Sequence, residues 1–135
     1  MLQSLVIIPF REEFDPVAST IKEAAEAAIP GTAIECRSLK EVKSAGRITD
    51  DILDGIEKSA FCIADLTGNN PNVMWDTGFA MALGKPTILI GQNVETLPFD
   101  LKVHRVHPYA RDDLKALRDT LGDAIRQTLA RYAIH

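Results

Sequence analysis

The sequence predicts an α/β protein: a three-layer sandwich with a five-stranded parallel sheet, strand order 2-1-3-4-5, and helices on both faces. Two observations carry this prediction. Short apolar runs alternate with longer segments of helical period along the 135 residues, which is the pattern of strand–helix–strand crossovers. Residues 61–64 form an unbroken apolar run, as expected of a strand that is buried on both faces. The stated order is the usual one for five such strands.

The first half of the chain contains two strands and two helices in this prediction. Asp15 followed by Pro16 marks a helix start, because a capping side chain followed by proline suits the first helical turn. Thr49 is expected to cap the second helix, because threonine is a common capping residue. The expected elements are, in order, a strand at residues 5–8, a helix ending at 29–31, a strand at 33–39, a loop at 40–47 and a helix capped by Thr49.

The stretch from residue 61 to residue 90 predicts a strand, a polar loop, a helix and a second strand. Asn70 is expected to cap the helix, with Pro71 at its first position. Gly84 suits the left-handed residue that ends a helix, and Pro86 prevents its continuation. Such a crossover joins two parallel strands of one sheet.

The last part of the chain predicts a fifth strand at residues 103–109 and a long helix at about 112–133. Apolar residues spaced three or four apart along this helix predict that it covers one face of the sheet. Part of that stripe would also serve a dimer. We therefore expect residues 1–135 to form a single domain, which at this length buries roughly two-thirds of its unfolded surface.

Composition and charge narrow the functional classes. The net charge is −4 and no basic cluster follows the chain, so we expect no nucleic-acid partner. No apolar run is long enough to cross a membrane, so no membrane association is expected. A strand that begins almost at Met1 leaves no room for a signal peptide, which predicts a cytoplasmic protein.

The sequence predicts neither a metal nor a cofactor. Cys36 and Cys62 fall in predicted strands and lack a CxxC partner, so we expect buried thiols that act as small hydrophobic residues. His104 and His107 are three residues apart on a predicted strand, which points their side chains to opposite faces. Neither pair has the spacing of a metal site.

Polar residues gather at the carboxyl ends of the predicted strands, where ligands bind in such folds. Asp65 ends the third strand, and Asp76 lies in an otherwise apolar half-helix, where a carboxylate is costly unless it is paired or used. Arg11 follows the first strand. The candidate ligand-binding residues are Pro9, Phe10, Arg11, Thr67, Gly68, Asn69, Asn70, Asn72 and Trp75.

Four of these residues also have a structural explanation. Asp76 would also suit an early helical turn because the helix dipole favours an acid there. Arg11 either meets an anion or is a solvated side chain beside two glutamates. Phe10 and Trp75 either stack on a base or belong to the core.

Several segments follow one another in an order that resembles a known family. They are residues 8–10, 48–52, 64–73, 78–86 and 97–101, of which ADLTGNNPNV at 64–73 belongs to the more specific part. The pattern resembles the bacterial nucleoside 2-deoxyribosyltransferase-like proteins. It resembles still more closely a related group of predicted nucleotide-binding proteins with a Toll/interleukin-receptor-like (TIR-like) domain. The resemblance covers roughly the first 110 residues.

This resemblance implies a flavodoxin-like fold, a homodimer and action on the N-glycosidic bond of a nucleoside, a nucleotide or NAD. A family glutamate that attacks the anomeric carbon of the sugar maps onto Asp76, and an aspartate that binds the sugar or the leaving base maps onto Asp65. Two departures stand out. Asp76 replaces the usual glutamate, which removes about 1.5 Å of reach, and Trp75 replaces the usual tyrosine.

Three functional classes follow from these residues. The first is an enzyme, a hydrolase if water accepts the sugar and a transferase if a second base does. The second is a non-catalytic module that binds a nucleotide, favoured by the shortened acid and by the lack of an obvious general-base histidine. A phosphoacceptor receiver is disfavoured, because Pro9-Phe10-Arg11 stands where receivers carry paired acids and Pro108-Tyr109 stands where they need a lysine.

Overall fold

The computed structural model describes residues 2–38, 48–98 and 104–132, and for residues 48–50 it describes the backbone but not the side chains. In this part of the chain the sheet has five parallel strands. The strand order is β2-β1-β3-β4-β5, so the predicted order and the flavodoxin-like fold class are confirmed. The strands are β1 (Leu2–Ile7), β2 (Ile34–Ser38), β3 (Phe61–Asp65), β4 (Thr87–Gly91) and β5 (Val106–Pro108).

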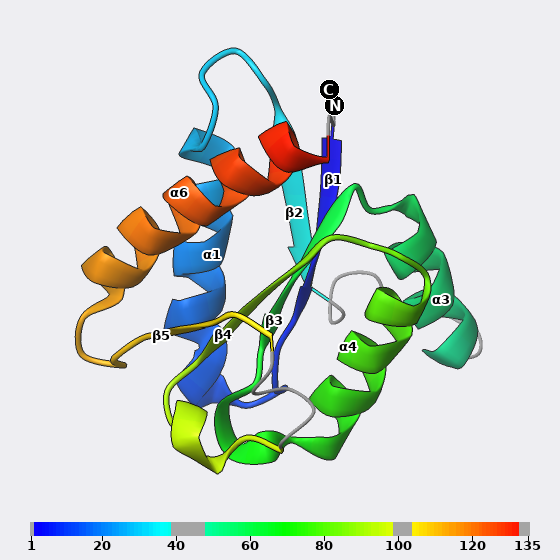
Figure 1. Cartoon of the computed structure of the whole chain (residues 1–135), viewed down its shortest axis with the longest axis vertical. Coiled ribbons are helices and arrows are strands. Elements are labelled where there is room, and N and C mark those ends of the chain that lie inside the picture. The colour runs from blue at the N-terminus through cyan, green and yellow to red at the C-terminus, as the bar shows by residue number, and fades with distance from the viewer. Residues whose placement is uncertain (1, 39–47, 99–103, 133–135) are drawn as a thin grey trace.

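Helices cover both faces of this sheet (Figure 1). The helices α1 (Asp15–Ala27) and α6 (Leu114–Arg131) pack on one face, and α3 (Ile48–Lys58) and α4 (Pro71–Ala82) pack on the other. Short 3₁₀ turns, η1 (Glu12–Phe14), η2 (Thr67–Asn69) and η3 (Val94–Thr96), follow β1, β3 and β4. They all lie at the edge of the sheet where the parallel strands end.

Strand β3 supplies side chains to both hydrophobic cores. Phe61 and Ile63 join the core under α1 and α6, whereas Cys62 and Ala64 join the core under α3 and α4. The period-2 alternation of a strand explains this division. An unbroken apolar run is therefore required at β3, because neither of its faces meets water.

The ends of α4 follow the predicted signals. The Oδ1 atom of Asn70 accepts hydrogen bonds from the backbone amides of Asn72 (3.0 Å) and Val73 (3.2 Å), which satisfies amides that lack an intrahelical partner. Gly84 has φ 76° and its amide donates to the Met81 carbonyl at 3.0 Å. A residue with a Cβ adopts this left-handed backbone only at a cost.

Several predicted boundaries differ from those of the structure. Asp15 is the first residue of α1 and not its cap, because η1 runs directly into the helix through Phe14. Strand β5 starts at Val106, so His104 precedes it and the pair of histidines does not share a strand. Only three residues of β5 pair with β4. Thr49 was expected to cap the second helix, but it lies inside α3, which includes Ile48 before it. The predicted loop at 40–47 lies outside the described residues.

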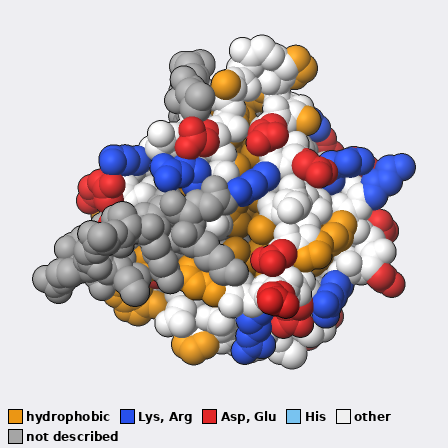
Figure 2. All heavy atoms as spheres, turned by 180° about the vertical axis from the view of Figure 1, so that it is seen from behind, with side chains coloured by type: hydrophobic (Ala, Val, Ile, Leu, Met, Phe, Trp, Pro, Cys, Tyr) orange, Lys and Arg blue, Asp and Glu red, His pale blue; other side chains and the backbone are white. Residues whose placement is uncertain are grey.

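The surface on the far side of the view in Figure 1 carries charges of both signs. Figure 2 shows lysine and arginine side chains interspersed with aspartate and glutamate over the described part of that face.

Within the described residues, no helix combines the length and the hydrophobicity that a membrane span requires. Cys36 and Cys62 are both buried in strands, as predicted, and burial raises the pKa of the Cys62 thiol to about 12.

One buried hydroxyl on β1 leads to a stability prediction. Ser4 is 2% exposed, and its Oγ has no hydrogen-bond partner among the residues that the structure describes. A buried polar group without a partner is destabilising. We therefore expect Ser4→Ala to raise the free energy of unfolding by about 1 kcal/mol, as measured by urea denaturation.

Ser59→Ala is the matched control. Ser59 is also buried, but its hydroxyl donates to the Gly55 carbonyl at 2.7 Å. Its replacement should lower the free energy of unfolding, because a hydrogen bond is lost. Equal losses of stability in the two variants would show that the Ser4 hydroxyl is not an unsatisfied group.

Candidate functional site

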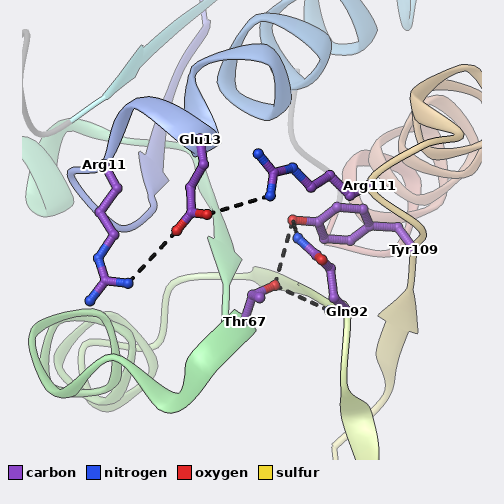
Figure 3. A network of polar contacts seen from close by, with 6 residues as sticks. All are labelled: Arg11, Glu13, Thr67, Gln92, Tyr109 and Arg111. Atoms are coloured by element: carbon purple, nitrogen blue, oxygen red, sulfur yellow. Dashed lines mark hydrogen bonds and ion pairs between the residues drawn. The ribbon is translucent and has the colours of Figure 1, made fainter.

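Four strands bring polar side chains to one edge of the sheet. Residues Ile7 and Ala64 are paired, as are Asp65 and Ile90, so β1, β3 and β4 end at nearly the same level. The segments after these strands and after β5 carry the side chains in Figure 3, which come from elements far apart in the sequence. The residues drawn there are Arg11, Glu13, Thr67, Gln92, Tyr109 and Arg111.

Asp65 is the centre of this arrangement. Its side chain is fully buried, and both carboxylate oxygens accept hydrogen bonds. Oδ1 accepts from the backbone amide (3.0 Å) and the hydroxyl (2.5 Å) of Thr67. Oδ2 accepts from the Tyr109 hydroxyl at 2.5 Å. A buried carboxylate is tolerated because these donors replace the water that it has lost.

Gln92 closes the network around Asp65. Its backbone amide donates to the Thr67 hydroxyl oxygen at 3.1 Å, and its side-chain amide donates to the Tyr109 hydroxyl oxygen at 3.1 Å. Thr67 and Tyr109 thus each donate to Asp65 and accept from Gln92. The ends of β3, β4 and β5 are joined by side chains as well as by the sheet.

Burial shifts the pKa values of Asp65 and Tyr109. Loss of solvent raises the pKa of Asp65, and the hydrogen bonds from Thr67 and Tyr109 partly oppose that rise. Burial and the neighbouring Asp65 carboxyl together raise the pKa of Tyr109 far above its ordinary value. Tyr109 therefore remains a hydroxyl donor at neutral pH.

Asp76 lies on the buried side of α4. It is 6% exposed, and the other buried residues of the helix are Val73, Thr77 and Ala80. It is the one residue of α4 with an ionisable side chain. Because α4 starts just after β3 and η2, Asp76 lies in the half of the helix that is nearer the polar edge.

Two of the predicted asparagines hold the loop between β3 and α4. Asn70 caps α4, and the Asn69 side-chain amide donates to the Thr96 carbonyl at 2.9 Å. Asn69 and Gly68 both have positive φ, 52° and 76°, a backbone that glycine and asparagine adopt most readily. Asn72 is exposed at the start of α4. These residues shape the loop that separates Asp65 from Asp76.

The aromatic candidates are not core residues. Phe10 is 41% exposed and Trp75 is 56% exposed, whereas Pro9 is buried at the end of β1. The Trp75 ring stacks on Phe79 with centroids 5.5 Å apart and an interplanar angle of 25°. The core alternative for Phe10 and Trp75 is therefore excluded.

Arg11 forms an ion pair with Glu13, one of the two glutamates beside it in the sequence. The Arg11 Nη1 and Glu13 Oε1 atoms are 3.7 Å apart, and the other oxygen of Glu13 lies 3.4 Å from Nη1 of Arg111. Figure 3 shows the two arginines pointing toward Glu13 from opposite sides. Two cations thus share one carboxylate at the polar edge.

Sequence reasoning did not identify Gln92, Tyr109 or Arg111 as site residues. Gln92 comes directly after β4, and Tyr109 comes directly after β5. The available signal was their position at strand ends, which is the signal that identified Asp65. The sequence instead predicts Tyr109 as the last residue of the fifth strand. Among the described residues, no group of three or more His, Cys, Asp and Glu side chains is placed to hold a metal ion.

The same fold, defined by its strand order and its layers, occurs in the solved structure of a transferase. A 2-desoxiribosyltransferase from Leishmania mexicana matches with a TM-score of 0.52 and 17% sequence identity, covering 87% of this chain and 97% of that one. At this identity the likeness shows a shared fold. No family model and no curated protein matches the sequence.

The raised pKa of Asp65 predicts a pH dependence of stability. The folded protein holds this proton more tightly than the unfolded chain, whose pKa is near 3.8. The resulting stabilisation is fully present below that pKa and is lost as the pH rises through the higher folded-state pKa. We expect the free energy of unfolding of the wild-type protein to fall over this range relative to that of Asp65→Asn, as measured by urea denaturation at a series of pH values.

Tyr109→Phe provides the second arm of this experiment. It removes a hydrogen bond that lowers the pKa of Asp65, so the loss of stability should extend to higher pH than in the wild-type protein. It should also lower stability at pH 7 by roughly 1–3 kcal/mol, because a buried carboxylate loses a donor. Parallel pH curves for all three proteins would contradict the assignment to Asp65.

Proposed function

We propose that the protein acts on the N-glycosidic bond of a nucleoside or nucleotide, with Asp76 as the nucleophile. The observation that carries this proposal is a pair of buried carboxylates in one crossover unit: Asp65 at the centre of the strand-end network, and Asp76 in the first half of α4, the helix that follows that strand end. Buried acids at the carboxyl edge of a parallel sheet are a frequent form of active site. The fold shared with a 2-desoxiribosyltransferase supports the same reaction class.

In the proposed reaction a carboxylate oxygen of Asp76 forms a bond to the anomeric carbon of the sugar. The bond from that carbon to the base breaks, and the base leaves with the electron pair and takes a proton from water. The transition state has oxocarbenium character, as in retaining glycosidases. Water or a second base then attacks the anomeric carbon and releases the Asp76 carboxylate, so the protein is a hydrolase or a transferase according to the acceptor.

Asp65 acts through its neighbours in this proposal. Its oxygens already accept from Thr67 and Tyr109 and it has no exposed surface. We therefore assign it the role of orienting these two hydroxyl groups, which face the sugar or the leaving base in its place. The exposed rings of Phe10 and Trp75 are the groups proposed to stack on the base.

A second candidate is a non-catalytic module that binds a nucleotide, as the TIR-like resemblance suggests. The replacement of glutamate by Asp76 favours it, because a misplacement of about 1 Å can lower a rate a hundredfold. Both candidates use the same candidate site residues. They differ in whether the bond to the base is broken.

A turnover assay tests the proposal. The purified protein is incubated with NAD and with a panel of ribo- and deoxyribonucleosides and their monophosphates, with and without an acceptor base, and released base is measured by chromatography. We expect Asp76→Asn to lose turnover by roughly a millionfold, the order found when a catalytic nucleophile is removed. Its folding is checked by circular dichroism.

Asp54→Asn is the matched control, because Asp54 is an exposed acid on α3 that pairs with Lys58. It should turn over substrate at the wild-type rate. Unchanged activity in Asp76→Asn would overturn the assignment. Binding without turnover in the wild-type protein, together with a gain of turnover in Asp76→Glu, would establish the binding module instead.

A further inference from the structure

Two arginines from opposite ends of the sequence meet at the candidate site. Arg11 follows β1 and Arg111 follows β5, and both lie against Glu13 in η1. Strands β3 and β4 lie between β1 and β5 in the sheet. The two arginines therefore flank the strand ends that carry Thr67 and Gln92 (Figure 3).

The charges of this cluster do not balance. Two guanidinium groups share one carboxylate, so these three side chains together carry a net charge of +1. The side chains of Arg11, Arg111 and Glu13 are 70%, 60% and 42% exposed. Ion pairs this exposed and this long contribute little to stability, so an incoming anion can replace Glu13 at small cost.

We propose that Arg11 and Arg111 bind the phosphate of a nucleoside 5′-monophosphate, which makes the phosphorylated nucleoside the preferred substrate. Arginine suits this role because its planar donor fork matches a phosphate. The carboxylate of Glu13 occupies the position between the two guanidinium groups when no phosphate is bound. This proposal rests on the proposed function, since it names the substrate of the same site.

The competing explanation is that the ion pairs simply tie η1 to the segment before α6. The two explanations predict opposite effects of Glu13→Gln on the binding of the monophosphate. If the ion pair between Arg111 and Glu13 is only a structural tie, Arg111→Gln and Glu13→Gln break the same contact. The two variants then change monophosphate binding in the same direction. If the arginines bind phosphate, Arg111→Gln weakens the binding of the monophosphate, whereas Glu13→Gln removes the competing carboxylate and strengthens it.

The experiment measures the binding and turnover of a nucleoside and of its 5′-monophosphate side by side, by calorimetry and by the base-release assay. The wild-type protein should prefer the monophosphate. Arg11→Gln and Arg111→Gln should each weaken monophosphate binding by about tenfold, the order expected for one lost charge-assisted hydrogen bond. Each variant should weaken the binding of the monophosphate more than it weakens the binding of the unphosphorylated nucleoside.

Arg118→Gln is the matched control, because Arg118 forms an exposed pair with Glu23 at 3.7 Å between α6 and α1. It should bind both ligands as the wild-type protein does. Inorganic phosphate should compete with the monophosphate in the wild-type protein and compete less in Arg111→Gln. Thermal unfolding of every variant identifies any change that is due to folding.

Three different results would overturn the proposal. Equal use of nucleoside and monophosphate, unaffected by the arginine variants, would remove the phosphate site and leave the proposed function intact. Failure of the wild-type protein to bind either ligand would overturn both. Weaker monophosphate binding in Glu13→Gln as well as in Arg111→Gln would establish the structural tie.

Discussion

The buried carboxylate of Asp65 is the constraint on which the arrangement of this edge depends. A charge placed at the end of a fully buried strand must be surrounded by donors, and the donors come from Thr67 and Tyr109. Tyr109 lies beyond β5, so satisfying one carboxylate at the end of β3 also fixes the position of the segment after β5. Gln92 completes the arrangement from β4. The same requirement fixes the start of η2, and with it the loop that leads to α4 and Asp76.

Much of the fold was predictable because local signals and global packing agree. The unbroken apolar run of β3, the Asn70-Pro71 start of α4 and the left-handed Gly84 each occur where the structure needs them. The strand order followed from the alternation of strands and helices. The boundaries that were wrong, at Asp15 and at the start of β5, depend on how the chain continues from a neighbouring turn or pairs with a neighbouring strand, which residue type alone does not encode.

The candidate site was predictable in part. Residues that follow β1 and β3 were identified because their strands are strongly apolar and end in clear polar positions. Gln92 and Tyr109 were missed because their contribution depends on contacts across the sheet, with Tyr109 reaching a residue 44 positions earlier in the chain. The contact that brings Arg111 to Glu13, and so to Arg11, is likewise not visible in the sequence, since Glu13 and Arg111 are 98 positions apart. Such contacts become apparent only when the strand ends are placed side by side.

The stacked pair of Trp75 and Phe79 has a practical consequence. Trp75 is the single tryptophan of the chain, is about half exposed and immediately precedes Asp76. All intrinsic indole fluorescence of the protein therefore originates one residue from the buried acid of α4. Its emission wavelength and its quenching by iodide report the polarity and the accessibility of that environment without any added label. A change in that environment can thus be followed in real time on the unmodified protein.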